Sequence, residues 1–141
     1  MTDIERAKAL LAGEKSLVLC KGEKTIESTK RGVAPMVDFL REGVDLTGFS
    51  AADRVVGKAA AMLFVKAGVV EVYAEVVSAK GRETLESHGV KCSCGVATDK
   101  ILNRDKTGLC PMETAVGDEE DAEKAFALIS DKLDELRKPR A

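Results

Sequence analysis

The stretch that most constrains the fold runs from residue 69 to residue 97. The segment "VVEVYAEVV" is rich in β-branched residues and contains neither Gly nor Pro, which predicts a central strand. Ser78 can cap the helix expected in "AKGRETLESHG", and "VKCSCGVAT" predicts another strand. Consecutive strands joined by a helix form a right-handed parallel crossover when they share a sheet. We therefore expect an α/β fold with at least one parallel pair of strands.

The segment before this unit predicts a helix followed by a hairpin. Thr2 and Glu5 have the spacing of a capping box, and apolar residues then recur at helical intervals until Gly13. The runs "SLVLCK" and "KTIEST" flank Gly22, which can supply the positive φ of a tight turn. The first two strands are therefore expected to be antiparallel.

Three further helices complete the predicted order of elements. Pro35 suits the first turn of a short helix that Gly43 would end. Ser50 lies three residues before Asp53, which is another capping signature, so "SAADRVVGKAAAMLFVKAG" is expected to be one helix, apolar on most faces. Asp118 is expected to cap the final helix. Together these elements predict a mixed sheet with helices on both faces.

The composition restricts the class of protein. A chain of 141 residues with 45% hydrophobic residues fits one domain, residues 1–141, in which 137–141 form a frayed tail. A net charge of -2 and the absence of Trp argue against nucleic-acid binding. No segment has the character of a signal peptide or a membrane span, so we expect a cytoplasmic protein without membrane partners. Its four cysteines are expected to be reduced thiols, with Cys20 in the core.

Cys110 is the first candidate for chemistry. In "NRDKTGLCPMETAV", Pro111 suits the first turn of a helix, which would put Cys110 at the cap and Glu113 at the third helical position. Amide groups and the helix dipole would then favour the thiolate. The alternative is that Cys110 fills a small gap where a loop enters the core.

Lys58 is the second candidate, because it is the only charge between Arg54 and Lys66. A buried lysine can act as a base or as a Schiff-base amine, and Gly57 beside it would let a ligand approach closely. The alternative is a solvated helical stripe, since Arg54, Lys58, Met62 and Lys66 are spaced four apart.

Other polar residues have simpler interpretations. Cys92 and Cys94 point to the same face of a strand and could join Cys110 around a metal, but structural zinc sites use wider Cys spacing and four ligands. No metal or other cofactor is therefore expected. His88 precedes Gly89 and is expected to lie at a helix C-terminus. The loop residue Asn103 could bind a ligand or could simply be solvated.

"DRVVGKAAA" and "NRDKTGLCPMETAV" together resemble the signatures of a small prokaryotic family, the domain of unknown function numbered eighteen ninety-three. The resemblance covers nearly the whole chain. It implies a cytidine-deaminase-like fold, which is a three-layer α/β/α sandwich, and the predicted order of elements agrees with that fold.

The zinc-deaminase mechanism is not implied with the fold. Those enzymes use H-x-E or C-x-E at the start of one helix and P-C-x-x-C at the start of the next, to hold a metal that activates water. Here the corresponding starts read "DRVVGK" and "SAKGR", which contain no such ligands. The segment "CPME" at 110–113 lacks the second cysteine and follows another strand.

Two functional hypotheses follow. The first is a metal-independent enzyme or a binder of a nucleotide-like or other anionic small molecule, with its site at the helix starts beyond the carboxyl ends of the central strands. The second is a non-catalytic ligand sensor or an oligomeric module, for which a homodimer is the simplest form. In the first hypothesis the catalytic residues are Cys110 as nucleophile, Lys58 as its electrostatic partner or proton carrier and Glu113 as acid or base; the ligand-binding residues are Asn103, Ser78, Lys80 and Asp53.

Overall fold

The computed structural model describes residues 1–102 and 108–137. In this part of the chain, five strands form one sheet in the order β2-β1-β3-β4-β5. The strands are β1 (Leu17–Lys21), β2 (Lys24–Ser28), β3 (Ser50–Val56), β4 (Glu71–Ser78) and β5 (Lys91–Thr98). The helices are α1 (Asp3–Leu10), α2 (Ala34–Arg41), α3 (Lys58–Ala67), α4 (Ala79–Ser87), α5 (Pro111–Val116) and α6 (Ala122–Arg137).

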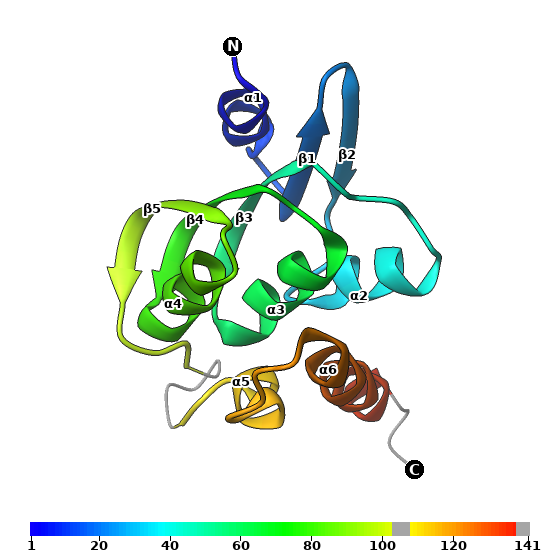
Figure 1. The fold of residues 1–141 in the computed structure, drawn as a ribbon, viewed down its shortest axis with the longest axis vertical. Coiled ribbons are helices and arrows are strands. Elements are labelled where there is room, and N and C mark those ends of the chain that lie inside the picture. Colours follow the sequence, from blue (N-terminus) through cyan, green and yellow to red (C-terminus); the bar gives the residue numbers. More distant parts are fainter. Residues whose placement is uncertain (103–107, 138–141) are drawn as a thin grey trace.

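The sheet is mixed, as the sequence predicts (Figure 1). Strand β1 pairs antiparallel with both β2 and β3, whereas β3, β4 and β5 run parallel to one another. The predicted hairpin and the predicted parallel crossover from β4 through α4 to β5 are both confirmed. The carboxyl ends of β3, β4 and β5 therefore meet at one edge of the sheet.

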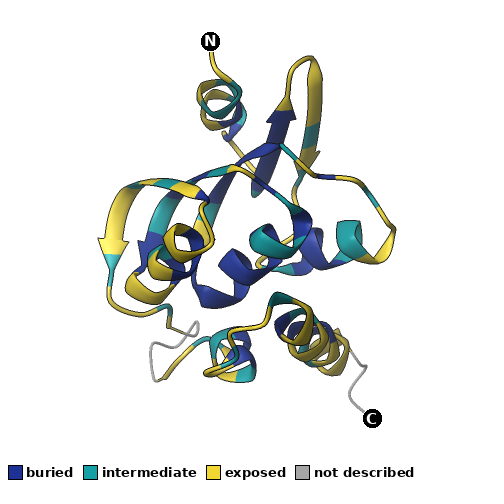
Figure 2. Cartoon of the chain, viewed as in Figure 1, coloured by how far each residue is buried: buried dark blue, intermediate teal, exposed yellow. Residues whose placement is uncertain are grey.

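Helices cover both faces of the sheet. Helix α1 lies on one face, where it packs a small cluster that includes Ala7, Leu11 and Cys20. The larger core lies on the other face, beneath α2, α3 and α6, and Phe64 and Leu63 of α3 are fully buried in it. Figure 2 shows α3 as the most deeply buried helix. Cys20 is fully buried, which confirms its prediction as a core residue.

Local signals place several helix ends correctly. The Glu5 amide donates to Thr2 Oγ1 at 3.2 Å, and the Gly81 amide donates to Ser78 Oγ at 3.0 Å, so Thr2 and Ser78 are N-caps as expected. Gly68 ends α3 in the left-handed conformation, with φ of 80°.

The prediction of one helix over 50–68 was wrong in its first half. Residues Ser50–Val56 form β3, and α3 begins only at Lys58 after Gly57. The small side chains of Ala51 and Ala52 favour helix in isolation. In the fold, however, they lie between β1 and β4 and face the two opposite cores, so tertiary packing overrides their intrinsic preference.

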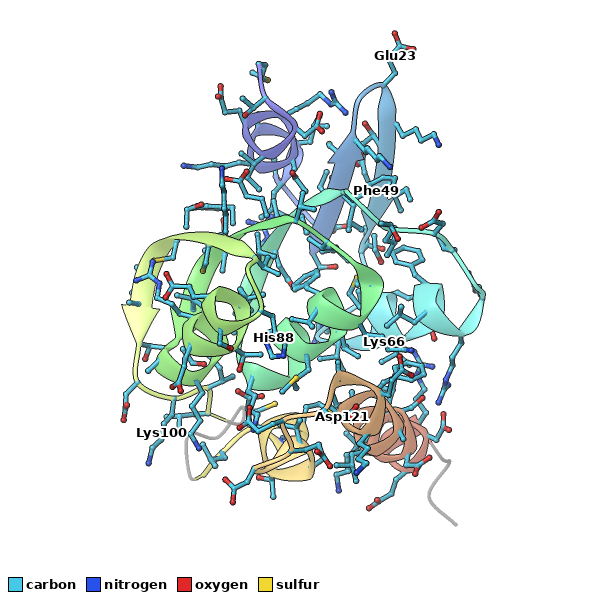
Figure 3. All side chains as sticks on the ribbon, viewed as in Figure 1. Glu23, Phe49, Lys66, His88, Lys100 and Asp121 are labelled. Atoms are coloured by element: carbon cyan, nitrogen blue, oxygen red, sulfur yellow. The ribbon has the colours of Figure 1, made fainter. Side chains whose placement is uncertain are left out.

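The predicted cap of the final helix was also misplaced. Helix α6 begins at Ala122, and the carboxylate of Asp121 accepts from the Glu123 and Lys124 amides at 2.8 and 3.2 Å. Asp121, labelled in Figure 3, therefore caps α6 in place of Asp118, which belongs to the turn after α5.

Candidate functional site

A cavity of about 570 Å³ opens where the parallel strands end. It is bordered by the starts of α3 and α4, by the segment after β5 and by α5. Four predicted site residues line it, namely Lys58, Ser78, Lys80 and Glu113. The fold thus brings together residues that are up to 55 positions apart, and it does so at the edge that the sequence hypothesis names.

Lys58 lies at the first position of α3 and is only 5% exposed. Its Nζ donates to the carbonyl oxygen of Gly117 at 2.9 Å and lies 3.4 Å from the Glu120 carboxylate. The alternative of a solvated helical stripe is wrong, because Arg54 belongs to β3 and Met62 is fully buried. These two contacts hold the buried Lys58 side chain at the cavity wall.

Glu113 lies on α5, far along the chain from α3, but its side chain caps the N-terminus of α3. Its two carboxylate oxygens accept from the backbone amides of Lys58 and Ala59, each at 2.8 Å. These amides are among those that a helix leaves without an internal partner, and the helix dipole favours a negative charge there. A Cβ atom at Gly57 would overlap this carboxylate, so the missing side chain makes the contact possible. Glu113 therefore joins α5 to the start of α3.

Ser78 and Lys80 come from the junction of β4 and α4. Ser78 is 2% exposed and its hydroxyl is engaged by the Gly81 amide, so it shapes the cavity wall. Lys80 is exposed in the first turn of α4 and lines the cavity. Gly81 lies so close to the turn before α3 that an added Cβ would come within 2.7 Å of the Val56 carbonyl oxygen.

Cys110 occupies the N-cap of α5, the position that the sequence predicts. Its amide donates to the carbonyl oxygen of Ile101 at 3.0 Å, and its side chain makes no capping hydrogen bond. The half-buried sulfur packs against the larger core, and Cys110 is not among the residues that line the cavity. The structure therefore brings Glu113, but not Cys110, into the group around Lys58.

Asp53 lies within β3, between Leu17 and Ala74 of the neighbouring strands, and does not line the cavity. Burial raises the pKa of its carboxyl group to about 7, although the Arg54 amide, 2.7 Å away, partly opposes this shift. The other predicted ligand-binding residue, Asn103, lies outside the described residues.

Cys92, Cys94 and His88 lie away from the cavity, and each contacts a neighbouring group of the protein. Arg82 of α4 lies against Cys92 and Cys94, with its Nη2 3.6 Å from the Cys94 sulfur. Burial raises the pKa of Cys92, while the nearby Arg82 opposes that shift. Within residues 1–102 and 108–137, no three His, Cys, Asp or Glu side chains are grouped so that they could hold a metal ion. His88 is the C-cap of α4, and its Nδ1 lies 2.8 Å from the Thr84 carbonyl oxygen.

The sequence interpretation missed the contribution of the segment that follows β5. Asp99 and Lys100 line the cavity beside Ser78, and Ile101 and Leu109 form an apolar part of its wall. The signal was available, because residues directly after a parallel strand lie at the same edge as Ser78. Figure 3 shows Lys100 beyond the end of β5, on the side where α5 lies.

Comparisons with known proteins agree with this architecture. A search of curated proteins gave no match. A crystal structure of a DUF1893 family protein from Thermotoga maritima is similar, with a TM-score of 0.76 and 27% sequence identity over 84% of this chain and 80% of that one. Among the described residues, every helix is too short or too polar to cross a lipid bilayer. Residues 5–133 match the family described as a domain of unknown function, DUF1893, and the chain therefore belongs to that family.

Proposed function

We propose that this protein binds a small anionic molecule, nucleotide-like in size, in the cavity at the carboxyl ends of β4 and β5. The observation that carries the proposal is the convergence of Lys58, Lys80 and Lys100 on this one cavity. In open α/β sheets, ligands bind in the crevice beyond the carboxyl ends of the strands. A cytoplasmic location and a small-molecule partner, without nucleic acid or membrane, form part of the proposal.

The size and walls of the cavity support binding of a small molecule. Its volume of about 570 Å³ lies within the range of roughly 300–1,000 Å³ that is usual for ligand pockets. Ile101, Leu109 and Ala79 supply apolar surface, on which the body of a ligand such as a nucleoside could pack. Polar groups are confined to a few positions, which is the pattern of a site that orients its ligand.

Two exposed lysines in the cavity lining, Lys80 and Lys100, favour an anionic group on the ligand. Of the three carboxylates in the lining, that of Glu113 is already compensated by two backbone amides. Lys80 and Lys100 are exposed, and the side-chain contacts of the described residues include none with a carboxylate for either. An ammonium group that is free to close on a phosphate or carboxylate forms charge-assisted hydrogen bonds. Asp99 and Asp118 remain for polar groups such as ribose hydroxyls.

The geometry supports binding more strongly than thiol catalysis. A nucleophile must come within about 3–3.5 Å of the atom that it attacks. Cys110 does not line the cavity, and both oxygens of Glu113 are engaged by the start of α3. Lys58 is likewise engaged by Gly117. The hypothesis that Cys110 acts as a nucleophile therefore requires a rearrangement of α5, whereas binding does not.

We also propose that the fold is cytidine-deaminase-like. The support is the mixed sheet with parallel β3, β4 and β5, the crossovers through α3 and α4, and the separate helix α1 on the opposite face. The helix starts that would carry zinc ligands in such enzymes here carry Gly57, Lys58, Ser78 and Lys80. Function is accordingly argued from the cavity and not from the fold.

Replacing Lys80 by alanine is expected to weaken ligand binding by about tenfold or more, since a hydrogen bond to a charged group contributes roughly 1.5–3 kcal/mol. The probes are inorganic phosphate, the nucleoside monophosphates and the corresponding nucleosides, titrated into the full chain by calorimetry. Native mass spectrometry of freshly purified protein is used to detect any molecule that copurifies, which then becomes a further probe. The expected order of affinity is monophosphate above nucleoside.

Lys124→Ala is the matched control, because Lys124 is an exposed lysine on α6 that does not line the cavity. It should bind the same probe with unchanged affinity. Absence of binding for every probe and of any copurifying molecule would contradict the proposal, and so would an equal loss of affinity in Lys80→Ala and Lys124→Ala.

Cys110→Ser separates binding from thiol chemistry. Because the sulfur lies outside the cavity lining, this variant is expected to bind the probe that the parent protein binds most tightly in the titrations, with the same affinity as the parent. Mass spectrometry of the parent protein after incubation with the probe should also show no covalent adduct. An adduct on Cys110, or binding that disappears in Cys110→Ser, would restore the nucleophile hypothesis.

A further inference from the structure

Strand β5 forms an open edge of the sheet. It pairs with β4 on one side, and on its other side no strand of the described chain pairs with it. Figure 1 shows this edge at the margin of the molecule, and Figure 2 shows β5 as largely exposed. Its eight residues span about 27 Å and leave a row of backbone amides and carbonyls without a partner in the sheet.

Within the part of the chain that the structure describes, β5 has few of the features by which edge strands usually avoid pairing. Monomeric proteins protect such strands with several charges, with proline or with a covering helix or loop. Between Lys91 and Thr98 the strand contains one charge and no proline. Ser93, Gly95 and Val96 are exposed, and Val96 is 59% exposed, which leaves small uncharged side chains at the edge.

The charges at the two ends of β5 would be complementary between two copies of the chain. If two copies of β5 pair antiparallel about a twofold axis at Gly95, Lys91 of each copy lies opposite Asp99 of the other. Lys91 and Asp99 are both exposed at the two ends of the strand. Like charges are therefore kept apart and opposite charges are paired, which is the arrangement that an isologous interface requires.

Charged side chains also lie on the surface beside the β5 edge. A hollow of about 660 Å³ lies between α4 and the carboxyl end of β5, and it is lined in part by Arg82, Glu83 and Glu86. With a twofold axis at Gly95, this hollow would lie beside the amino end of β5 in the second copy. The hollow carries charges of both signs, from Arg82 and from Glu83 and Glu86.

We propose that β5 is a dimerisation edge, at which a second copy of this chain adds its own β5 in antiparallel orientation to form one continuous ten-stranded sheet. Pairing of the two edges satisfies the free amides and carbonyls of both strands and covers Val96. Asp99 borders both this interface and the proposed ligand cavity, but the pairing of backbone groups along β5 does not itself require the ligand.

The test is the mass of the full chain in solution. Sedimentation equilibrium over a wide concentration range should give twice the chain mass of 15.0 kDa. The double variant Ser93→Lys, Val96→Lys places like charges on both sides of the axis and should be monomeric. Its circular dichroism spectrum and thermal midpoint should remain those of a folded protein, because both positions are exposed.

Leu128→Lys is the control, since Leu128 is an exposed aliphatic residue on α6. It should remain dimeric. A parent protein that is monomeric throughout the range overturns the proposal. A dimer that survives the double variant, or that Leu128→Lys also dissociates, shows that another surface is used and overturns it as well.

Hydrogen exchange gives a second readout. In the parent dimer, the β5 amides that point away from β4 should exchange slowly, whereas in the monomeric double variant they should exchange at the rate of an exposed strand. Equal exchange of these amides in both proteins would count against pairing through β5, even if both proteins were dimers.

Discussion

Asp53→Asn is expected to stabilise the folded protein at and above neutral pH and to flatten the dependence of its stability on pH. Asp53 is buried in β3, and burial raises the pKa of its carboxyl group to about 7. Asparagine has the same shape and keeps an oxygen that can accept from the Arg54 amide. It carries no charge, so the cost of burying an ionised group disappears.

The direction of this pH dependence follows from the protonation state of the Asp53 carboxyl group in the folded and unfolded chains. Below about pH 4 it is protonated in both the folded and the unfolded chain. Between about pH 4 and pH 7 it ionises in the unfolded chain while it stays protonated in the folded one. The free energy of unfolding therefore falls as the pH rises, by on the order of 4 kcal/mol across the window.

Urea unfolding at a series of pH values checks this expectation. Asp38→Asn is the control, because Arg137 and Lys30 hold the pKa of Asp38 below its usual value. The contribution of Asp38 is lost only as the pH falls through that lowered pKa, below the window. Its variant should keep the parent slope between about pH 4 and pH 7. A parent protein whose stability does not fall in that window would refute the assignment to Asp53.

Gly81→Ala is expected to destabilise the protein by about 1–3 kcal/mol or more, although alanine is the better helix former. An added Cβ would lie 2.7 Å from the Val56 carbonyl oxygen and 3.0 Å from the Gly57 carbonyl carbon. Both are backbone atoms, so α4 itself must move away from the turn before α3. That movement would also widen the cavity at Ser78 and Lys80.

Thermal and denaturant unfolding measure the effect, and Gly108→Ala provides the comparison. Among residues 1–102 and 108–137, a Cβ at Gly108 meets no atom within 4 Å, and its φ is not in the left-handed region, so that variant should be close to neutral. If Gly81→Ala were as stable as Gly108→Ala, the close packing of α4 against the start of α3 would be incorrect.

Much of the architecture could be predicted because its signals are local. The Thr2 and Ser78 caps, the turn at Gly22 and the β-branched run of β4 each depend on a few neighbouring residues. Strand β3 could not be predicted in this way. It is buried on both faces, so it has no alternation of polar and apolar residues, and its alanines resemble the start of the helix that follows.

The candidate site was predictable only in part, for a related reason. Lys58, Ser78 and Lys80 follow from the rule that ligands bind beyond the carboxyl ends of parallel strands. Two contacts depend on how α5 packs against the start of α3: Glu113 accepts from the Lys58 amide, and Lys58 donates to the Gly117 carbonyl oxygen. No periodicity or spacing encodes that docking, and the expectation that Cys110 would lie in the same group therefore depended on adjacency in sequence alone.

The distance along the chain between α3 and its cap affects how the protein matures. The carboxylate that completes the start of α3 belongs to a residue 55 positions later. While the chain is being synthesised, the first turn of that helix stays uncapped until α5 has emerged from the ribosome. All five strands precede α5 in the chain, so we expect closure of the cavity to be a late event in biogenesis. A nascent chain that stops after β5 is expected to present an unfinished helix to chaperones and proteases.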